Sequence, residues 1–286
     1  MHVQLRDRVV RAITDDDAFR IIAASTTGTL RQAFAAQAAS GATARHFGNL
    51  LTGTILVRET MSPHHRVQAV LHGVSGTSRL VADTHPDGAT RGLVHLAEGA
   101  RDFRLGPGCL LQVVRSLASG KLFQGTVQTP PPAAVSSALM AYLQKSERVV
   151  CVIATGQCWR GADLVLAGGY VVQLLPGAPR GPLAEMTERL EALAGIDQLL
   201  EQTGTRPERL IAVLLGATPF ATTDERPVCF GCQCNEEAVV AAVASLRRDQ
   251  IAEMLRAEDA VELCCGYCRK SYRVGRGQLD GLLREC

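Results

Sequence analysis

Cys232-Gln233-Cys234 and, after thirty further residues, Cys265-Gly266-Tyr267-Cys268 are the two stretches that decide the organisation of this chain. In the second stretch two residues separate the thiols, and a tight turn of that length can aim both sulfurs at one ion. Gly266 supplies the backbone freedom that such a turn needs. Together the two pairs can complete a closed, tetrahedral Cys₄ site, so the pattern predicts a structural metal site with zinc as the cofactor.

The spacing alone does not settle which cysteines bind the metal. Cys229 forms a rival C-x-x-C pair with Cys232, and Cys286 is the last residue of the chain. Cys264 would point away from Cys265 if both lie on a strand, because neighbouring side chains on a strand face opposite sides. The three remaining cysteines lie in apolar surroundings, where we expect buried free thiols: Cys109, Cys151 and Cys158.

The chain carries no sign of export or of membrane insertion. Its first ten residues include Arg6, Asp7 and Arg8 and lack the apolar stretch of a signal peptide. The longest apolar runs, Val149–Ala154 and Leu210–Leu215, are far shorter than the ~20 residues of a membrane span. We therefore expect a cytoplasmic protein, in which clustered cysteines serve as metal ligands or redox sensors rather than as structural disulfides.

The C-x-C pair also suggests redox chemistry. When one of two neighbouring thiols is oxidised to a sulfenic acid, the other can condense with it to form a disulfide. A bound zinc ion keeps its cysteine ligands as thiolates, which is their reactive form. Structural zinc contributes roughly 10–16 kcal/mol in finger peptides, whereas a whole domain is stable by only ~5–15 kcal/mol. Loss of the metal is therefore expected to unfold the cysteine-rich end.

The rest of the sequence predicts an α+β fold with a large mixed α/β N-terminal core domain, residues 1–178. Its predicted helices cover 29–39, 42–56 and 135–144, and its predicted strands cover 67–71, 79–82, 110–114, 122–127, 149–155 and 162–166. A stretch dense in Pro and Gly, residues 176–182, marks a boundary. Beyond it we expect a helical linker over 179–226 and a small zinc-binding domain over 227–286.

Within the linker, apolar residues recur at helical spacing over residues 183–200, although Gly195 weakens this helix. A second helix is expected over 208–215. In the last domain, Asn235 can cap a helix that begins at Glu236. A helix capped by Asp249, a hairpin with its turn at Gly266-Tyr267, and a short helix over 279–283 are expected to follow.

At this point the sequence resembles the thirty-three-kilodalton chaperonins, a family of redox-regulated bacterial heat-shock proteins. The resemblance rests on the C-x-C at Cys232, the C-x-x-C at Cys265 followed by Tyr272, and the stretch Gly168–Ala178. It covers nearly the whole chain in order and length. The chain departs from the family pattern at Asn235-Glu236-Glu237, where a basic run is usual, and in having the additional Cys229 and Cys264.

The resemblance implies an ATP-independent chaperone, a holdase, and not an enzyme. It implies that Cys232, Cys234, Cys265 and Cys268 bind one zinc ion in the reduced, poorly active form. Oxidation would then form Cys232–Cys234 and Cys265–Cys268 disulfides, with loss of zinc, unfolding of the end domain and release of the linker. The implied partners are unfolding client proteins, a second copy of the chain in an oxidised homodimer, and a downstream ATP-dependent foldase. No membrane partner is implied.

Two other functions fit the cysteine spacing less well. A zinc-ribbon nucleic-acid-binding protein would need a basic surface, but residues 229–286 hold eight Lys or Arg against nine Asp or Glu. A thiol oxidoreductase would carry its C-x-x-C between a strand and a helix, whereas Cys265–Cys268 is predicted to form a hairpin turn. The chain also lacks a phosphate-binding loop, since Arg115 stands where the first glycine would be.

Overall fold

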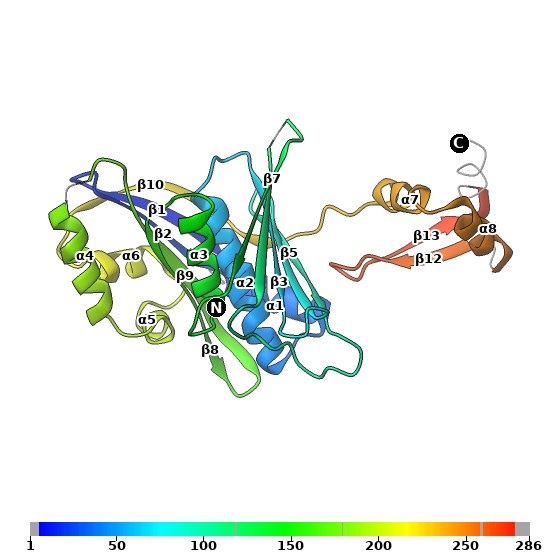
Figure 1. Cartoon of the computed structure of the whole chain (residues 1–286), viewed down its shortest axis with the longest axis horizontal. Coiled ribbons are helices and arrows are strands. Elements are labelled where there is room, and N and C mark those ends of the chain that lie inside the picture. The colour runs from blue at the N-terminus through cyan, green and yellow to red at the C-terminus, as the bar shows by residue number, and fades with distance from the viewer. Residues whose placement is uncertain (1–5, 118, 179, 258–259, 278–286) are drawn as a thin grey trace. The chain divides into compact units, whose positions relative to one another are not determined.

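The computed structural model describes residues 6–117, 119–178, 180–257 and 260–277. The chain divides into two units, Met1–Phe230 and Gly231–Cys286. Both contain helices and strands (Figure 1), so the predicted α+β class is confirmed. Residues 180–226 belong to the first unit, and the functional division into 1–178, 179–226 and 227–286 stays a prediction.

The first unit contains a five-stranded antiparallel sheet in the order β10-β1-β2-β9-β8. Its strands are β1 (Arg8–Thr14), β2 (Phe19–Ser25), β8 (Cys151–Arg160), β9 (Asp163–Leu174) and β10 (Phe220–Pro227). The two edges of this sheet are β10 and β8. The stretch Gly168–Ala178 therefore falls largely on β9, next to the centre of the sheet.

A second sheet of six strands has the order β11-β5-β4-β3-β6-β7. Its strands are β3 (Arg66–His72), β4 (Arg79–Thr84), β5 (Ala89–His95), β6 (Leu110–Ser116), β7 (Leu122–Gln128) and the short β11 (Cys229–Phe230). All neighbours are antiparallel except β11, which runs parallel to β5. Along β3 the burial alternates from residue to residue, as expected for a sheet with one face toward the core.

Three helices lie between the two sheets: α1 (Thr27–Gln37), α2 (Gly41–Glu59) and α3 (Val135–Lys145). The longest, α2, contacts β2, β8 and β9 on one side and β3, β4 and β5 on the other. It is nearly continuously buried from Leu50 to Glu59, in agreement with its apolar sequence. This central layer holds the main hydrophobic core of the molecule.

The opposite face of the five-stranded sheet is covered by α5 (Ile196–Thr203) and α6 (Pro207–Leu215), and α4 (Arg180–Ala192) packs against the same core. Because side chains alternate along a strand, β9 contributes to the hydrophobic cores on both faces of the sheet. Val171 faces the central layer, while Tyr170 and Val172 pack toward these helices. The predicted linker is thus seated on the sheet, with Met186 as the buried residue of α4.

The second unit is small. It contains α7 (Glu236–Ala244), α8 (Arg248–Ala257) and a two-stranded hairpin of β12 (Ala260–Cys264) and β13 (Ser271–Gly275). Only Val243 and Val274 are buried in its apolar cluster, with Val239, Val240, Val261 and Leu263 partly buried around them. The helix expected over 279–283 lies outside the described residues.

Several local expectations need correction. The single helix expected over 183–200 is two helices, α4 and α5, separated by residues 193–195. Gly195, which was expected to weaken the helix, is the residue that directly precedes α5. The end of the linker is not helical, since Phe220–Pro227 forms β10. Strands β1, β2 and β5 were also not predicted. Within the described ranges, no helix combines the length and the apolarity that crossing a bilayer requires.

Candidate metal centre

Cys232 and Cys234 lie in the irregular segment between β11 and α7. This segment ends at Asn235, whose side chain accepts a hydrogen bond from the Ala238 amide at 2.8 Å and so caps α7. The predicted cap is therefore confirmed. Since Cys234 directly precedes the cap, the start of α7 fixes where its sulfur lies.

Cys265 and Cys268 occupy the turn between β12 and β13. The Cys265 amide donates to the Lys270 carbonyl at 2.9 Å, and the Arg269 amide donates back to the Cys265 carbonyl at 2.9 Å. Arg269 adopts a left-handed conformation, with φ of 61°, to close the turn. The C-x-x-C thus lies in a hairpin turn, as predicted, rather than at the start of a helix as in a thiol oxidoreductase.

The structure brings the four cysteines of the two pairs together. Their sulfur atoms all lie within 4.8 Å of one another. The Sγ atoms of Cys232 and Cys265 are 3.8 Å apart, and those of Cys234 and Cys268 are 3.3 Å apart. A Zn–S bond of about 2.3 Å places the sulfurs of a tetrahedral site about 3.8 Å from each other. The cluster therefore has the donor set and the dimensions of a site that could hold a metal ion.

Tyr272, on β13, contacts the cluster through Cys234. Its phenol donates to the Cys234 carbonyl oxygen at 2.9 Å and, in a shared hydrogen bond, to Sγ of Cys234 at 3.1 Å. The ring is buried, and the ammonium group of Lys270 lies 5.2 Å from its centroid. The sequence singled out Tyr272 only as part of a motif. Its position on the return strand, alternating with the exposed Arg273, was the signal that it faces the cysteines.

These hydrogen bonds distribute charge unequally over the cluster. Burial opposes ionisation of Cys234, but hydrogen bonds from Tyr272 and the neighbouring thiols outweigh it and lower the pKa of Cys234 to about 7. At Cys268, burial and hydrogen bonding to the other thiols act in the same direction and raise the pKa to about 12. Cys234 therefore becomes a thiolate, the form that binds metals and reacts with oxidants, at a lower pH than Cys268.

Of the other C-terminal cysteines, the structure describes Cys229 and Cys264, and neither is one of the four clustered residues. Cys229 is exposed on β11 of the first unit. Cys264 is exposed on β12, and its thiol donates to the Arg269 carbonyl at 3.3 Å, so its side chain points away from that of Cys265 as predicted. Cys286 lies outside the described residues. The rival pair of Cys229 with Cys232 is therefore not the one that joins the cluster.

The three scattered cysteines are buried free thiols, as expected. Burial raises the pKa of Cys151 to about 12. The pKa of Cys158 rises to about 11, chiefly through burial and also through the negative charges of Asp197 and Glu201. At neutral pH both remain protonated, and neither competes with Cys234 for an oxidant or a metal.

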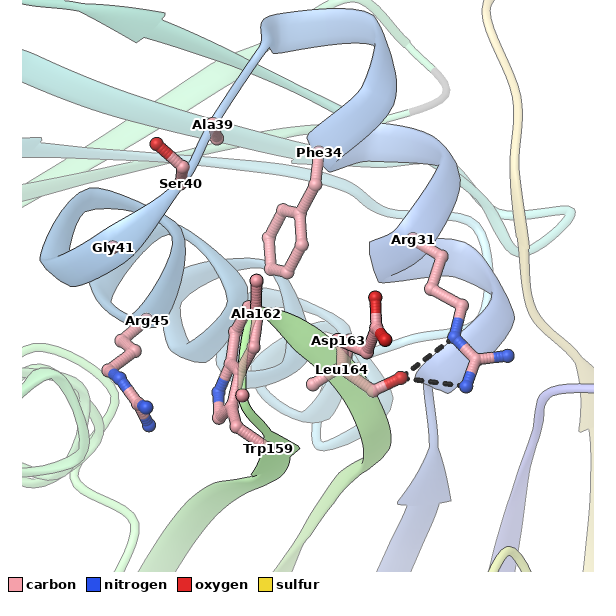
Figure 2. A pocket seen from close by; sticks show the side chains of 11 residues that line it. Arg31, Phe34, Ala39, Ser40, Gly41, Arg45, Trp159, Ala162, Asp163 and Leu164 are labelled. Carbon is pink, nitrogen blue, oxygen red and sulfur yellow. Dashed lines mark hydrogen bonds between the residues drawn. The ribbon is translucent and has the colours of Figure 1, made fainter.

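A hollow of about 700 Å³ lies between the end of α1, the start of α2 and the turn from β8 to β9. Figure 2 shows the side chains that line it. Arg31 donates to the Leu164 carbonyl at 2.9 and 2.7 Å. Trp159 stacks on Phe34, with centroids 5.8 Å apart, and the Arg45 guanidinium lies 5.1 Å from the Trp159 ring. The cysteine cluster, which brings four metal-ligating side chains together, is therefore the stronger candidate for the functional site.

Known proteins match nearly the whole length of this chain. A family model described as Hsp33 protein matches residues 7–275. A 33 kDa chaperonin of Listeria welshimeri is 30% identical over 295 residues, which span 98% of this chain and 99% of the relative. One of Syntrophotalea carbinolica is 27% identical over 289 residues, spanning 98% and 100%. The crystal structure of a 33 kDa chaperonin from Thermotoga maritima superposes with a TM-score of 0.84 at 20% identity, over 98% of each chain, and shows the shared fold.

Proposed function

Because the chain belongs to the Hsp33 protein family, we propose that it is a redox-regulated, ATP-independent chaperone of the cytoplasm. It binds unfolding client proteins and keeps them from aggregating, and it is not an enzyme. The observation that carries the redox part of this proposal is the cluster of four sulfurs within 4.8 Å of one another.

In the reduced form, Cys232, Cys234, Cys265 and Cys268 hold one zinc ion as thiolates. Four sulfur ligands leave no open coordination position, so the ion supplies a cross-link and no catalytic chemistry. The cross-link joins the segment before α7 to the turn between β12 and β13. Tyr272 orients the Cys234 ligand by its hydrogen bond, in the way that outer-shell partners orient metal ligands.

Oxidation removes the ligands. A peroxide converts one thiolate to a sulfenic acid, and the thiol of its partner displaces water to close the S–S bond. Each disulfide takes two electrons from the protein and consumes one peroxide, which leaves as two waters. Within the cluster every sulfur is near the other three. We propose the pairs Cys232–Cys234 and Cys265–Cys268, as the resemblance to the family implies; partners this close in sequence also stay close once the unit unfolds.

These disulfides would not replace the stability that the metal supplies. Each closes a very short loop, which removes little entropy from the unfolded chain. Among the described residues of the second unit, the buried apolar cluster holds Val243 and Val274, and Tyr272 is also buried. A domain with so small a core commonly needs a metal or a cross-link to fold. Oxidation is therefore expected to unfold residues 231–277.

We propose that unfolding spreads to the switch segment, residues 183–215, which includes most of α4 and all of α5 and α6. Much of α4 is exposed, and among its described side chains Met186 alone is buried, so packing stabilises this helix little. Release of the segment would uncover apolar surface of the five-stranded sheet, including Tyr170 and Val172. Such surface binds unfolded clients or a second copy of the chain, and clients would later pass to an ATP-dependent foldase.

One comparison tests the proposal. The full-length protein is assayed for suppression of thermal aggregation of an unrelated protein without ATP, once reduced and zinc-loaded and once after peroxide treatment at raised temperature. We expect suppression only after oxidation, together with release of about one zinc per chain into a chromogenic chelator. Equal activity of both forms would refute redox regulation, and a requirement for ATP would refute the holdase assignment.

A further inference from the structure

Strand β8 is an edge of the five-stranded sheet, and side chains from two helices accept hydrogen bonds from two of its amides. Thr155 and Gln157 lie opposite Gly169 and Ala167 of β9 at positions where the β8 amides point away from the sheet. The Thr155 amide donates to Ser136 Oγ of α3 at 3.3 Å. The Gln157 amide donates to Asp197 Oδ1 of α5 at 2.9 Å. Both side-chain oxygens occupy the place of a neighbouring strand's carbonyls.

The contact with α5 is unusually close. A Cβ atom at Gly156 would collide with Asp197 Oδ1 and would lie only 2.9 Å from Cγ1 and Cγ2 of Ile196. The Cys158 thiol donates to the Asp197 carbonyl oxygen at 3.2 Å. Glycine at position 156 thus allows the first turn of α5 to reach the strand, and Asp197 binds the strand at the two residues that follow this glycine, Gln157 and Cys158.

The side chains of this edge form one apolar row. Residues 150, 152, 154, 156 and 158 share a face of the strand, because side chains alternate. Val150 and Val152 at the start of the row are 55% and 39% exposed. Ala154 and Cys158 at the other end pack in the core shared with the linker helices. The row is therefore open at one end and covered by α5 at the other.

We propose that Asp197 is the positioning residue that holds the switch segment on the core, and that the edge beneath it, residues 156–158, receives an extended segment of an unfolded polypeptide once α5 leaves. This inference rests on the proposed function, because α5 must leave after oxidation. An edge strand pairs with any extended chain through main-chain hydrogen bonds. Such pairing suits a chaperone whose clients share no sequence, and the small residues at 154, 156 and 158 leave room for client side chains.

The positioning role is tested in the full-length, reduced, zinc-loaded protein. Asp197→Ala removes the acceptor of the Gln157 amide, whereas Asp197→Asn keeps an acceptor oxygen. Gln198→Ala, at the neighbouring exposed position of α5, is the matched control. Loss of one such hydrogen bond should speed hydrogen exchange of the α5 amides roughly two- to tenfold, with zinc retained. Exchange in Asp197→Asn should return toward that of the unmodified chain. Equal exchange in Asp197→Ala and Gln198→Ala would overturn the positioning role.

The docking role is tested in the oxidised full-length protein with reduced, carboxymethylated α-lactalbumin as a permanently unfolded probe. If the edge receives the probe, exchange of the Gln157 amide, which loses Asp197 as its acceptor, speeds up on oxidation and slows again when the probe binds. The Thr155 amide, which Ser136 of α3 holds, is the internal reference. A probe that coelutes with the protein but leaves exchange at Gln157 unchanged would overturn the docking site while leaving the chaperone function intact. Absence of any binding would contradict the proposed function and this inference together.

Discussion

The phenol oxygen of Tyr272 lies 3.1 Å from Sγ of Cys234 and donates toward it from the strand that follows the cysteine turn. This donor favours the thiolate of Cys234 and fixes the direction of its sulfur. The two residues are 38 positions apart in sequence, so the contact also joins the hairpin to the segment before α7.

Tyr272→Phe keeps the ring and removes this donor. We expect zinc affinity of the reduced protein to fall roughly tenfold or more, the usual cost of losing an outer-shell partner. Competition with a chromophoric chelator measures the affinity. Ser271→Ala, at the exposed preceding residue, is the control and should bind zinc normally. Unchanged affinity in Tyr272→Phe would mean that the hydrogen bond does not act on the metal site.

Removal of the metal should unfold one unit and spare the other. Stripping zinc from the reduced protein with a chelator, or replacing a ligand as in Cys265→Ser, removes a cross-link worth roughly 10–16 kcal/mol in small zinc domains. We expect α7, β12 and β13 to lose protection in hydrogen exchange, while β3 and β4 keep theirs. A second unit that stays protected without zinc would show that its apolar cluster is sufficient for folding.

The remaining C-terminal cysteines should be dispensable. Cys229 and Cys264 are exposed and lie apart from the four clustered sulfurs, and we predict the same for Cys286. Replacing all three with serine should leave about one zinc per chain and normal activation by peroxide. Loss of either property would mean that one of them acts as a ligand or as a disulfide partner.

Met186 and Leu183 of α4 differ in burial, so we expect Met186, and not Leu183, to hold the switch segment on the core. Met186 is 6% exposed, whereas Leu183 is 37% exposed. Met186→Asp should weaken docking by about 3 kcal/mol, because it removes buried apolar surface and places a carboxylate there. The reduced variant should then suppress aggregation in part while zinc stays bound. Leu183→Asp is the matched control, and equal behaviour of the two variants would count against docking through Met186.

Acid stability should depend on Asp83, which is fully buried in β4 and accepts hydrogen bonds from Arg66 at 2.7 Å and Arg91 at 2.9 Å. Burial opposes its ionisation, but His85, Arg66 and Arg91 together outweigh it and hold the pKa of Asp83 well below its usual value. A carboxyl group with a lowered folded-state pKa stabilises the fold above its unfolded pKa of about 4, and this contribution is lost as pH falls below that value.

Asp83→Asn should therefore destabilise the first unit at pH 7 by roughly 3 kcal/mol, since it leaves the Arg91 guanidinium without its carboxylate. It should also flatten the loss of stability below pH ~4. Denaturant unfolding at several pH values measures both effects. Asp163→Asn, at an exposed site, serves as the reference. A steep acid transition that persists in Asp83→Asn would assign it to other carboxyl groups.

The sequence predicted the cysteine cluster better than the sheets. The pairs at Cys232 and Cys265, the cap at Asn235 and the hairpin turn at Gly266 depend on residues close in sequence, and their spacing has a direct geometric meaning. Strand β10 gave no such signal: its residues are mostly polar and exposed, and it becomes a strand by pairing with β1. Strand propensity depends on such partners. Asp197 was missed for the same reason, because its partner, the Gln157 amide, lies 40 residues away.

The pairing of β1 with β10 also has a consequence for biosynthesis. Arg8 lies opposite Pro227, so β1 receives its outer neighbour only after the intervening residues of the first unit have been made. Because domains fold as units during synthesis, this core cannot complete its sheet until residue 227 has emerged. The cysteine cluster emerges later still, from Cys232 onward. A newly made chain therefore finishes its core before it can hold a metal, and zinc availability should affect the last step of maturation rather than the first.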